Sequence, residues 1–165
     1  MNGLIIRPCR VTDAPELAAL YHRAVREGAA GHYDPEQRAA WSPAPPSGEE
    51  WRRRLVEAQT VVAERAERLL GFMTLDAGTG WIDFAYVAPE AMGQGVAETL
   101  YAVLEGRARA AGLTRLETGA SLLAERFFGR RGWRVVERRA VALNGQHLPN
   151  AIMSKDLGPG LCHAA

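Results

Sequence analysis

The sequence predicts an α/β fold of the α+β kind, with a mixed, mostly antiparallel sheet of about seven strands and helices on both faces. Three observations predict it. Apolar runs of strand length alternate with amphipathic segments of helix length along the 165 residues. A three-strand meander over residues 60–87 precedes a strand–helix–strand unit, so antiparallel and parallel pairing are both expected. Asn144-Gly145 between two strand-like segments indicates a closing hairpin.

The composition is that of an ordinary globular protein, with 47% hydrophobic and 24% charged residues and a net charge of +1. We expect a single domain over residues 3–157 and a loose tail over 158–165. The charge balance gives no reason to expect nucleic-acid binding. The chain start has no signal-peptide core, and no window approaches a membrane span, so we expect a cytoplasmic protein that does not bind membranes. Cys9 and Cys162 are expected as free thiols, and no Cys or His spacing suggests a metal.

The elements follow from capping residues, glycine stops and periodicity. Thr12 or Asp13 can cap a helix that Gly28 ends, and Ser47 and Ser121 can cap later helices. The expected helices cover residues 12–28, 34–41, 47–57, 93–111 and 121–131, and the expected strands cover 4–7, 60–64, 69–75, 82–87, 113–118, 133–143 and 151–157.

Residues 29–50 are the least regular part of the chain, because four prolines interrupt their periodicity. His32, Tyr33 and Trp41 lie in this segment. Two interpretations stay open. These side chains either line a pocket or anchor a long connection onto the core.

A glycine-bearing turn joins the strand at 82–87 to the following helix. Gly93-Gln94-Gly95 lets the backbone approach a ligand closely. The first turn of a helix has unpaired N–H groups and the positive end of the dipole, so it binds anions. The turn therefore predicts a phosphate site, and the alternative is a turn that only packs tightly.

Two stretches resemble motifs of the GNAT superfamily of N-acetyltransferases. Residues 92–97 (MGQGVA) resemble its Gln/Arg-x-x-Gly-x-Gly/Ala signature, and Val87-Ala88-Pro89 matches the strand end that precedes it. Residues 121–133 (SLLAERFFGRRGW) resemble the second motif of the superfamily, with Ala124, Gly132 and Trp133 at the right spacing. The resemblance covers about residues 3–157.

The chain departs from the superfamily pattern at three positions. Met92 replaces the usual Arg or Gln, which removes a side-chain phosphate contact but no backbone donor. Ser121 replaces Asn, and Phe128 replaces the Tyr that often acts as general acid. The last change leaves the identity of the acid open.

The resemblance implies an acetyl-CoA-dependent N-acetyltransferase that uses no metal. An amine attacks the thioester directly, and the pantetheine arm of coenzyme A fills a gap between the strands that carry Val87 and Thr118. The residues expected to bind the cofactor are Val87, Met92, Gly93, Gln94, Gly95, Val96, Ala97 and Ser121.

The resemblance also implies catalytic and acceptor-binding roles. The N–H of Val87 would stabilise the oxyanion that develops at the thioester carbonyl. Asp83, an acidic residue within an apolar strand, is the candidate base if it is buried, and the alternative is a partly exposed residue on a strand face whose side chain bonds to a neighbour. Ser121 or water would protonate the thiolate, since Tyr86 should face away from Val87. His32, Tyr33 and Trp41 are expected near the substrate.

Other functions were weighed against this one. Met92 and Phe128 are compatible with a degenerate module that binds acyl-CoA as a sensor or interaction surface without turnover. A dinucleotide-binding fingerprint would need glycine where the chain has Glu98. The acceptor, a small-molecule or peptide amine, is not identified by the sequence. The edge strands of the C-terminal hairpin could also form a homodimer.

Overall fold

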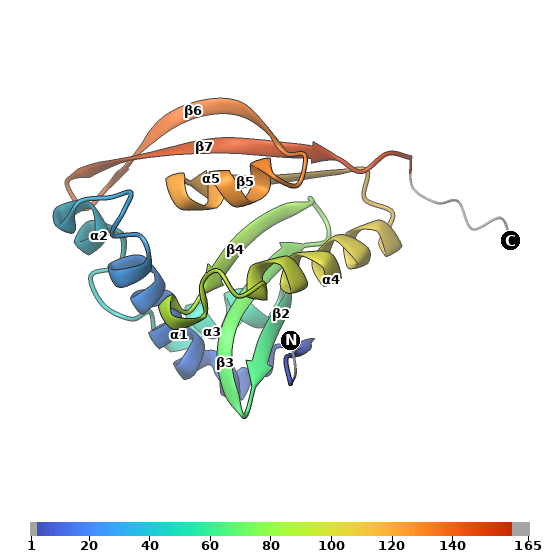
Figure 1. Cartoon of the computed structure of the whole chain (residues 1–165), viewed down its shortest axis with the longest axis horizontal. Helices are drawn as coiled ribbons and strands as arrows, with labels where there is room; N and C mark the ends of the chain where they lie inside the picture. Colours follow the sequence, from blue (N-terminus) through green and yellow to red (C-terminus); the bar gives the residue numbers. More distant parts are fainter. Residues whose placement is uncertain (1–2, 160–165) are drawn as a thin grey trace, which may run out of the picture.

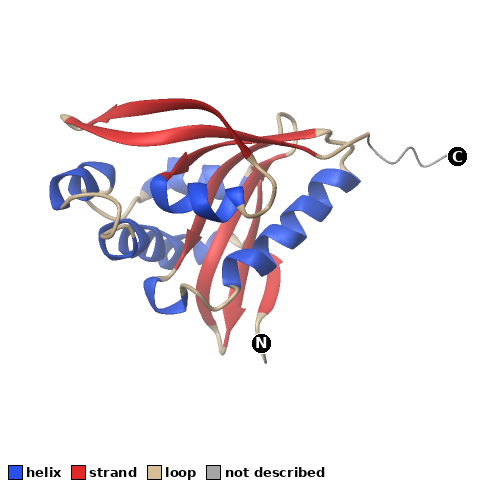
Figure 2. Ribbon diagram, turned by 45° about the horizontal axis from the view of Figure 1, so that its top comes forward, coloured by secondary structure: helices blue, strands red, loops and turns tan. Residues whose placement is uncertain are grey.

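The computed structural model describes residues 3–159 and contains a seven-stranded sheet with helices on both faces (Figure 1 and Figure 2). The strand order is β1-β2-β3-β4-β5-β7-β6, with β4 and β5 parallel and the other neighbours antiparallel. The expected fold class is confirmed. The elements are β1 (Ile5–Pro8), η1 (Val11–Asp13), α1 (Ala14–Arg23), η2 (Ala24–Gly28), α2 (Pro35–Trp41), α3 (Gly48–Val56), β2 (Gln59–Arg65), β3 (Arg68–Asp76), β4 (Trp81–Val87), η3 (Pro89–Ala91), α4 (Val96–Ala110), β5 (Arg115–Ser121), α5 (Leu122–Gly129), β6 (Arg134–Leu143) and β7 (Gln146–Asp156).

Most boundaries fall within a few residues of those expected, and β7 is the main exception. It begins at Gln146 instead of residue 151, because Pro149 pairs opposite Ala140 and does not end the strand. Asn144 and Gly145 both have positive φ, as the expected hairpin turn requires. Part of the tail expected to be loose, residues 160–165 with Cys162, lies outside the described residues.

One face of the sheet is covered by α1 and α3. Trp51 of α3 packs against Phe72 and Phe84, with ring centroids 6.3 and 5.3 Å away. Its Nε1 donates a hydrogen bond to the carbonyl of Ala14 at 2.8 Å. The indole is 5% exposed, so it joins both helices to the sheet in one buried cluster.

The other face is covered by α4, whose first turn rests directly on β3. A Cβ at Gly71 would lie 2.9 Å from the carbonyl oxygen of Tyr86 and 3.1 Å from side-chain carbons of Val96 and Leu100. Only glycine allows this approach without displacing a neighbour. Gly71 therefore fixes where the N-terminus of α4 stands on the sheet.

The sheet opens between β4 and β5. These strands pair only at Trp81↔Glu117 and Ile82↔Thr118. Beyond those pairs β4 continues along β3, while β5 continues along β7. The two strands therefore carry Val87 and Ser121 apart, as the family resemblance implies.

No helix within residues 3–159 is long and apolar enough to cross a membrane.

Candidate active site

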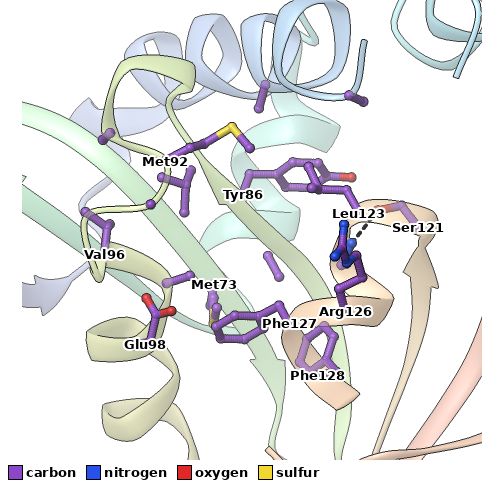
Figure 3. Close-up of a pocket in the computed structure, with 18 of the residues that line it drawn as sticks. Met73, Tyr86, Met92, Val96, Glu98, Ser121, Leu123, Arg126, Phe127 and Phe128 are labelled. Carbon is purple, nitrogen blue, oxygen red and sulfur yellow. Dashed lines mark hydrogen bonds between the residues drawn. The ribbon is translucent and has the colours of Figure 1, made fainter. Parts of the chain in front are cut away.

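A cavity of about 320 Å³ lies between the diverging ends of β4 and β5 (Figure 3). Its walls come from the end of β4, the glycine turn, the first turn of α4 and one side of α5. The cavity is also lined by Ala24 and Ala29, from the segment that joins α1 to α2, and by Trp41, the last residue of α2. One cavity therefore connects the glycine turn to the irregular segment of residues 29–50.

The glycine turn has the backbone conformation of an anion site. Gly93 and Gly95 have φ values of 75° and 80°, where other residues are strained. A Cβ on Gly93 would meet no atom within 4 Å, so the turn faces open space. No side chain caps α4, which leaves the N–H groups of its first turn for a ligand. Glu98 in that turn is paired with Arg131 at 3.7 Å, which offsets its charge beside the site.

The N–H of Val87 points into the cavity. Ala88 N donates to Leu70 O at 2.8 Å, so these two residues form a hydrogen-bonded pair of the antiparallel β3–β4 ladder. Because such pairs alternate with non-bonded ones, the Val87 amide opposite Gly71 turns away from β3. Since β5 has diverged at this level, this donor is directed to the side where the cavity lies.

The α5 wall begins with a capped helix. Ser121 Oγ accepts a hydrogen bond from Ala124 N at 3.1 Å, so its primary role is an N-cap, and its own proton can still be donated. Phe128 is 1% exposed and packs 4.7 Å from the Trp133 ring. It lines the cavity and contributes no hydroxyl group there.

The cavity collects most of the residues expected in the site. The residues that line it are Trp41, Val87, Met92, Gly93, Gly95, Val96, Ala97 and Ser121. Gln94 does not line it, because its amide donates to Glu90 O at 2.9 Å. His32 also lies outside the lining, and its buried Nδ1 has no hydrogen-bond partner among residues 3–159. Tyr33 lies behind Trp41, with ring centroids 5.4 Å apart.

Asp83 is the partly exposed, paired residue of the alternative interpretation and is not buried. Its side chain is 37% exposed and its carboxylate accepts a hydrogen bond from Arg54 at 2.8 Å. Asp83 is the extra residue of a β-bulge, since its neighbours Ile82 and Phe84 pair with the consecutive residues Leu75 and Thr74. It lines a second, open pocket with Arg54 and not the main cavity. It does follow Ile82 directly, so it stands where β4 and β5 begin to separate.

Sequence reasoning missed Tyr86 as a lining residue. Strand alternation puts Tyr86 on the opposite face of β4 from Val87, yet both residues line the cavity. At this level β4 has no neighbour on its β5 side, so the cavity reaches both faces of the strand. The Tyr86 ring packs 4.7 Å from that of Tyr21. Burial raises the pKa of Tyr86 well above its usual value. The gap that was expected beside β4 could have predicted Tyr86 as a lining residue.

Arg126 and Phe127 of α5 and Arg130, the C-cap residue after it, were also missed as lining residues. Arg130 keeps helical backbone angles and is four residues from Arg126, so the two side chains share a face. They are exposed cations on the cavity wall, which suits an anionic ligand.

Comparisons with known proteins agree with this architecture. Residues 29–154 match the model of the acetyltransferase (GNAT) domain family. An Escherichia coli K12 protein named as the uncharacterized N-acetyltransferase YafP is 31% identical over 153 residues, which cover 93% of this chain and 96% of that protein.

Solved structures show the same fold. A GCN5-related N-acetyltransferase from Rhodopseudomonas palustris is 34% identical, with a TM-score of 0.88 over 95% of this chain and 98% of that one. The PaiA N-acetyltransferase of Thermoplasma acidophilum, solved with coenzyme A, has a TM-score of 0.77 at 18% identity and covers 93% of this chain and 99% of its own. The family model and the two more similar relatives agree, and the chain therefore belongs to the GNAT family of N-acetyltransferases.

Proposed function

We propose that this enzyme transfers the acetyl group of acetyl-CoA to a primary amine, which attacks the thioester directly. The observation that carries the proposal is the uncapped N-terminus of α4, with its left-handed Gly93 and Gly95, at one end of a cavity that also contains the Val87 amide. Acetyl-CoA supplies the activated acyl group. The PaiA structure contains coenzyme A, and a phosphinothricin acetyltransferase from Sinorhizobium meliloti with a TM-score of 0.74 was solved with acetyl-CoA, which supports this donor.

The backbone of this chain fits the donor without the arginine or glutamine that Met92 replaces. The N–H groups of residues 93–97 would hold the pyrophosphate, and they do not depend on side-chain identity. The Met92 side chain lines the cavity without a charge or a hydrogen-bond donor, and its sulfur lies 3.3 Å from where a Cβ of Gly28 would be. The Val87 N–H would stabilise negative charge on the thioester carbonyl oxygen.

Two side chains would move protons. Asp83 would accept a proton from the amine through water that enters where the strands separate, since its carboxylate does not line the main cavity, and Arg54 holds that carboxylate in place. Ser121 would donate to the thiolate while its oxygen still caps α5. A thiol with a pKa near ~8.5 leaves readily, so the absence of a hydroxyl at Phe128 does not prevent turnover.

Phe128 and Met92 favour a second candidate, an acyl-CoA-binding module without turnover. The two functions share the donor site and differ in chemistry. Release of free thiol from acetyl-CoA in the presence of an amine separates them.

Calorimetric titration with acetyl-CoA tests the proposal. Gly95→Glu puts an anion and a strained left-handed residue at the start of α4, so binding should fall at least about 100-fold. Gly106→Glu is the matched control, because it makes the same change in an exposed turn of the same helix, where a Cβ meets no atom within 4 Å. Equal affinities in the two variants, or no binding by the wild type, would refute the donor site.

A further inference from the structure

The α2 helix and the β6–β7 hairpin form a clamp beside the end of the cavity that Trp41 lines. In Figure 1 these elements lie against each other at the same end of the molecule. Gln37 of α2 donates to the carbonyl of His147 at 3.0 Å, and Asn144 of the hairpin turn donates to the carbonyl of Ala40 at 2.8 Å. The segment after α1 and the hairpin are therefore joined at more than one point.

Tyr33 is the buried centre of this clamp. Its hydroxyl donates to the carbonyl of Pro149 at 2.5 Å and accepts from the backbone N–H of Leu122 at 3.0 Å. The side chain is 4% exposed and packs with Ala29 and Leu148. One hydroxyl thus binds β7 and the first residue of α5 at the same time, and both of its hydrogen-bonding functions are used.

The same segment is also fixed on its other side. Arg38 donates to the carbonyls of Tyr33 and Arg26, and Arg26 donates to the carbonyl of Ser42 at 3.1 Å. His22 of α1 contacts the Ser42 hydroxyl at 2.7 Å. Buried, multiply bonded backbone of this kind does not open easily. The clamp is therefore a fixed wall of the cavity.

The inner surface of this wall is aromatic and uncharged. Trp41 lines the cavity, packs edge-on against Tyr33, and lies 6.4 Å from the Tyr86 ring. Figure 3 shows Tyr86, Leu123 and Met92 around the same space. The charged residues that line the cavity are Glu98 of α4, Arg126 of α5 and Arg130, which follows α5.

We propose that Tyr33 and Trp41 make the acceptor end a narrow, partly open aromatic chamber, so that the acceptor is a small primary amine bearing an apolar or aromatic group. This inference rests on the proposed acetyl transfer. A cavity of about 320 Å³ must also admit the acylated end of coenzyme A, which leaves little room for an extended polypeptide. The faces of Trp41 and Tyr86 suit an ammonium group with apolar surroundings. A polyamine would leave its second charge unpaired there.

Bisubstrate analogues test the chamber without requiring turnover. In each analogue an acetyl linker on the sulfur of coenzyme A is joined to the nitrogen of 2-phenylethylamine, of spermidine, or of the N-terminus of a hexapeptide. We expect the phenylethylamine analogue to bind the wild type about tenfold or more tightly than coenzyme A, and the other two to bind no more tightly than coenzyme A. A hexapeptide or spermidine analogue that equals the phenylethylamine one would overturn the chamber, as would a phenylethylamine analogue with no advantage.

Two variants separate a specific role from a general loss of structure. Trp41→Ala should remove the advantage of the phenylethylamine analogue and leave coenzyme A affinity unchanged. Tyr33→Phe keeps the ring but loses both clamp hydrogen bonds, so the hexapeptide analogue should gain severalfold over coenzyme A. A purely structural role would shift all ligands together, and that result would overturn the assignment of Tyr33 as a positioning residue.

Asn144→Asp provides a second clamp variant if Tyr33→Phe does not fold. Aspartate tolerates the positive φ of this turn but cannot donate to Ala40. It should shift selectivity toward the hexapeptide analogue as well, and unchanged selectivity would count against the clamp. If coenzyme A itself does not bind the wild type, the result refutes the proposed function and not only the chamber.

Discussion

The two ends of the cavity are built in different ways. The donor end consists of backbone groups within a short stretch, the turn at Gly93–Gly95 and the first turn of α4. The acceptor end consists of side chains whose positions depend on contacts across the whole chain, such as Tyr33 with Pro149, which are 116 residues apart. Side-chain changes such as Met92 should therefore be tolerated at the donor end, whereas single side chains at the acceptor end should determine which amine reacts.

Among the substitutions that test this comparison, we expect the largest loss of activity at Asp83. Asp83→Asn removes the proposed proton acceptor and keeps a side chain that can bond Arg54, so kcat/KM should fall by about 100-fold or more. Affinity for acetyl-CoA should not change, because Asp83 does not line the main cavity. Steady-state thiol release with a saturating amine, together with calorimetry, measures both.

Asp76→Asn is the matched control for this substitution. Asp76 lies in the same second pocket, and its carboxylate accepts from Gly78 N at 2.8 Å within the β3–β4 turn. The control should retain activity. A loss of less than about threefold in Asp83→Asn would assign Asp83 to pairing with Arg54 alone.

The same contrast explains what the sequence could predict about the fold. Capping residues, glycine stops and the Asn144-Gly145 turn are local signals, and the elements that they predict are confirmed within a few residues. The start of β7 was missed because Pro149 ordinarily ends a strand, and its pairing with Ala140 is a tertiary fact. The π-helical turn η2 after α1 carries no local signal that distinguishes it from the end of a helix.

The same distinction between local signals and tertiary contacts applies to the candidate site. The glycine turn and Val87 could be predicted from a motif, because their proposed role in donor binding depends on backbone groups, and glycine encodes the conformation of the turn locally. For Asp83 the sequence leaves a buried base and a partly exposed, paired residue both open, because the bulge and Arg54 that expose and pair it arise only on folding. Tyr33 was expected near the substrate, but its contacts with β7 and α5 make it a support behind Trp41.

A smaller effect tests whether the donor end depends on packing below the turn. Gly71→Ala would place a Cβ 2.9 Å from the Tyr86 carbonyl and press on Val96 in the first turn of α4. We expect a loss of about 1–3 kcal/mol in the free energy of unfolding, together with weaker acetyl-CoA binding. Urea denaturation and calorimetry measure the two effects. Gly106→Ala, exposed in the middle of α4, should instead stabilise the protein slightly, and equal behaviour of the two variants would contradict the packing role of Gly71.

The smallest expected effect concerns the other end of α4, where Glu105 holds the helix to β7. Its carboxylate accepts hydrogen bonds from Lys155 at 3.0 Å and from Arg109 at 2.8 Å. Burial by itself would raise the pKa of Glu105, but hydrogen bonds from Tyr101, Arg109 and Lys155 outweigh it and lower the pKa to about 2.

Because the folded-state pKa of Glu105 lies below its unfolded value near 4.5, its contribution to stability is complete above pH 4.5 and is lost as the pH falls toward 2. Glu105→Gln should therefore lower the free energy of unfolding by about 1–2 kcal/mol at pH 7, with the difference from wild type shrinking as the pH falls from 4.5 toward 2. Urea denaturation at a series of pH values measures this difference. A difference that stays constant down to pH 2 would mean that the Glu105 charge does not stabilise α4. Because Glu105 anchors α4 in this way at neutral pH, substitutions at the clamp should leave the acetyl-CoA affinity of the glycine turn unchanged. The two ends of the cavity should therefore respond to substitutions independently.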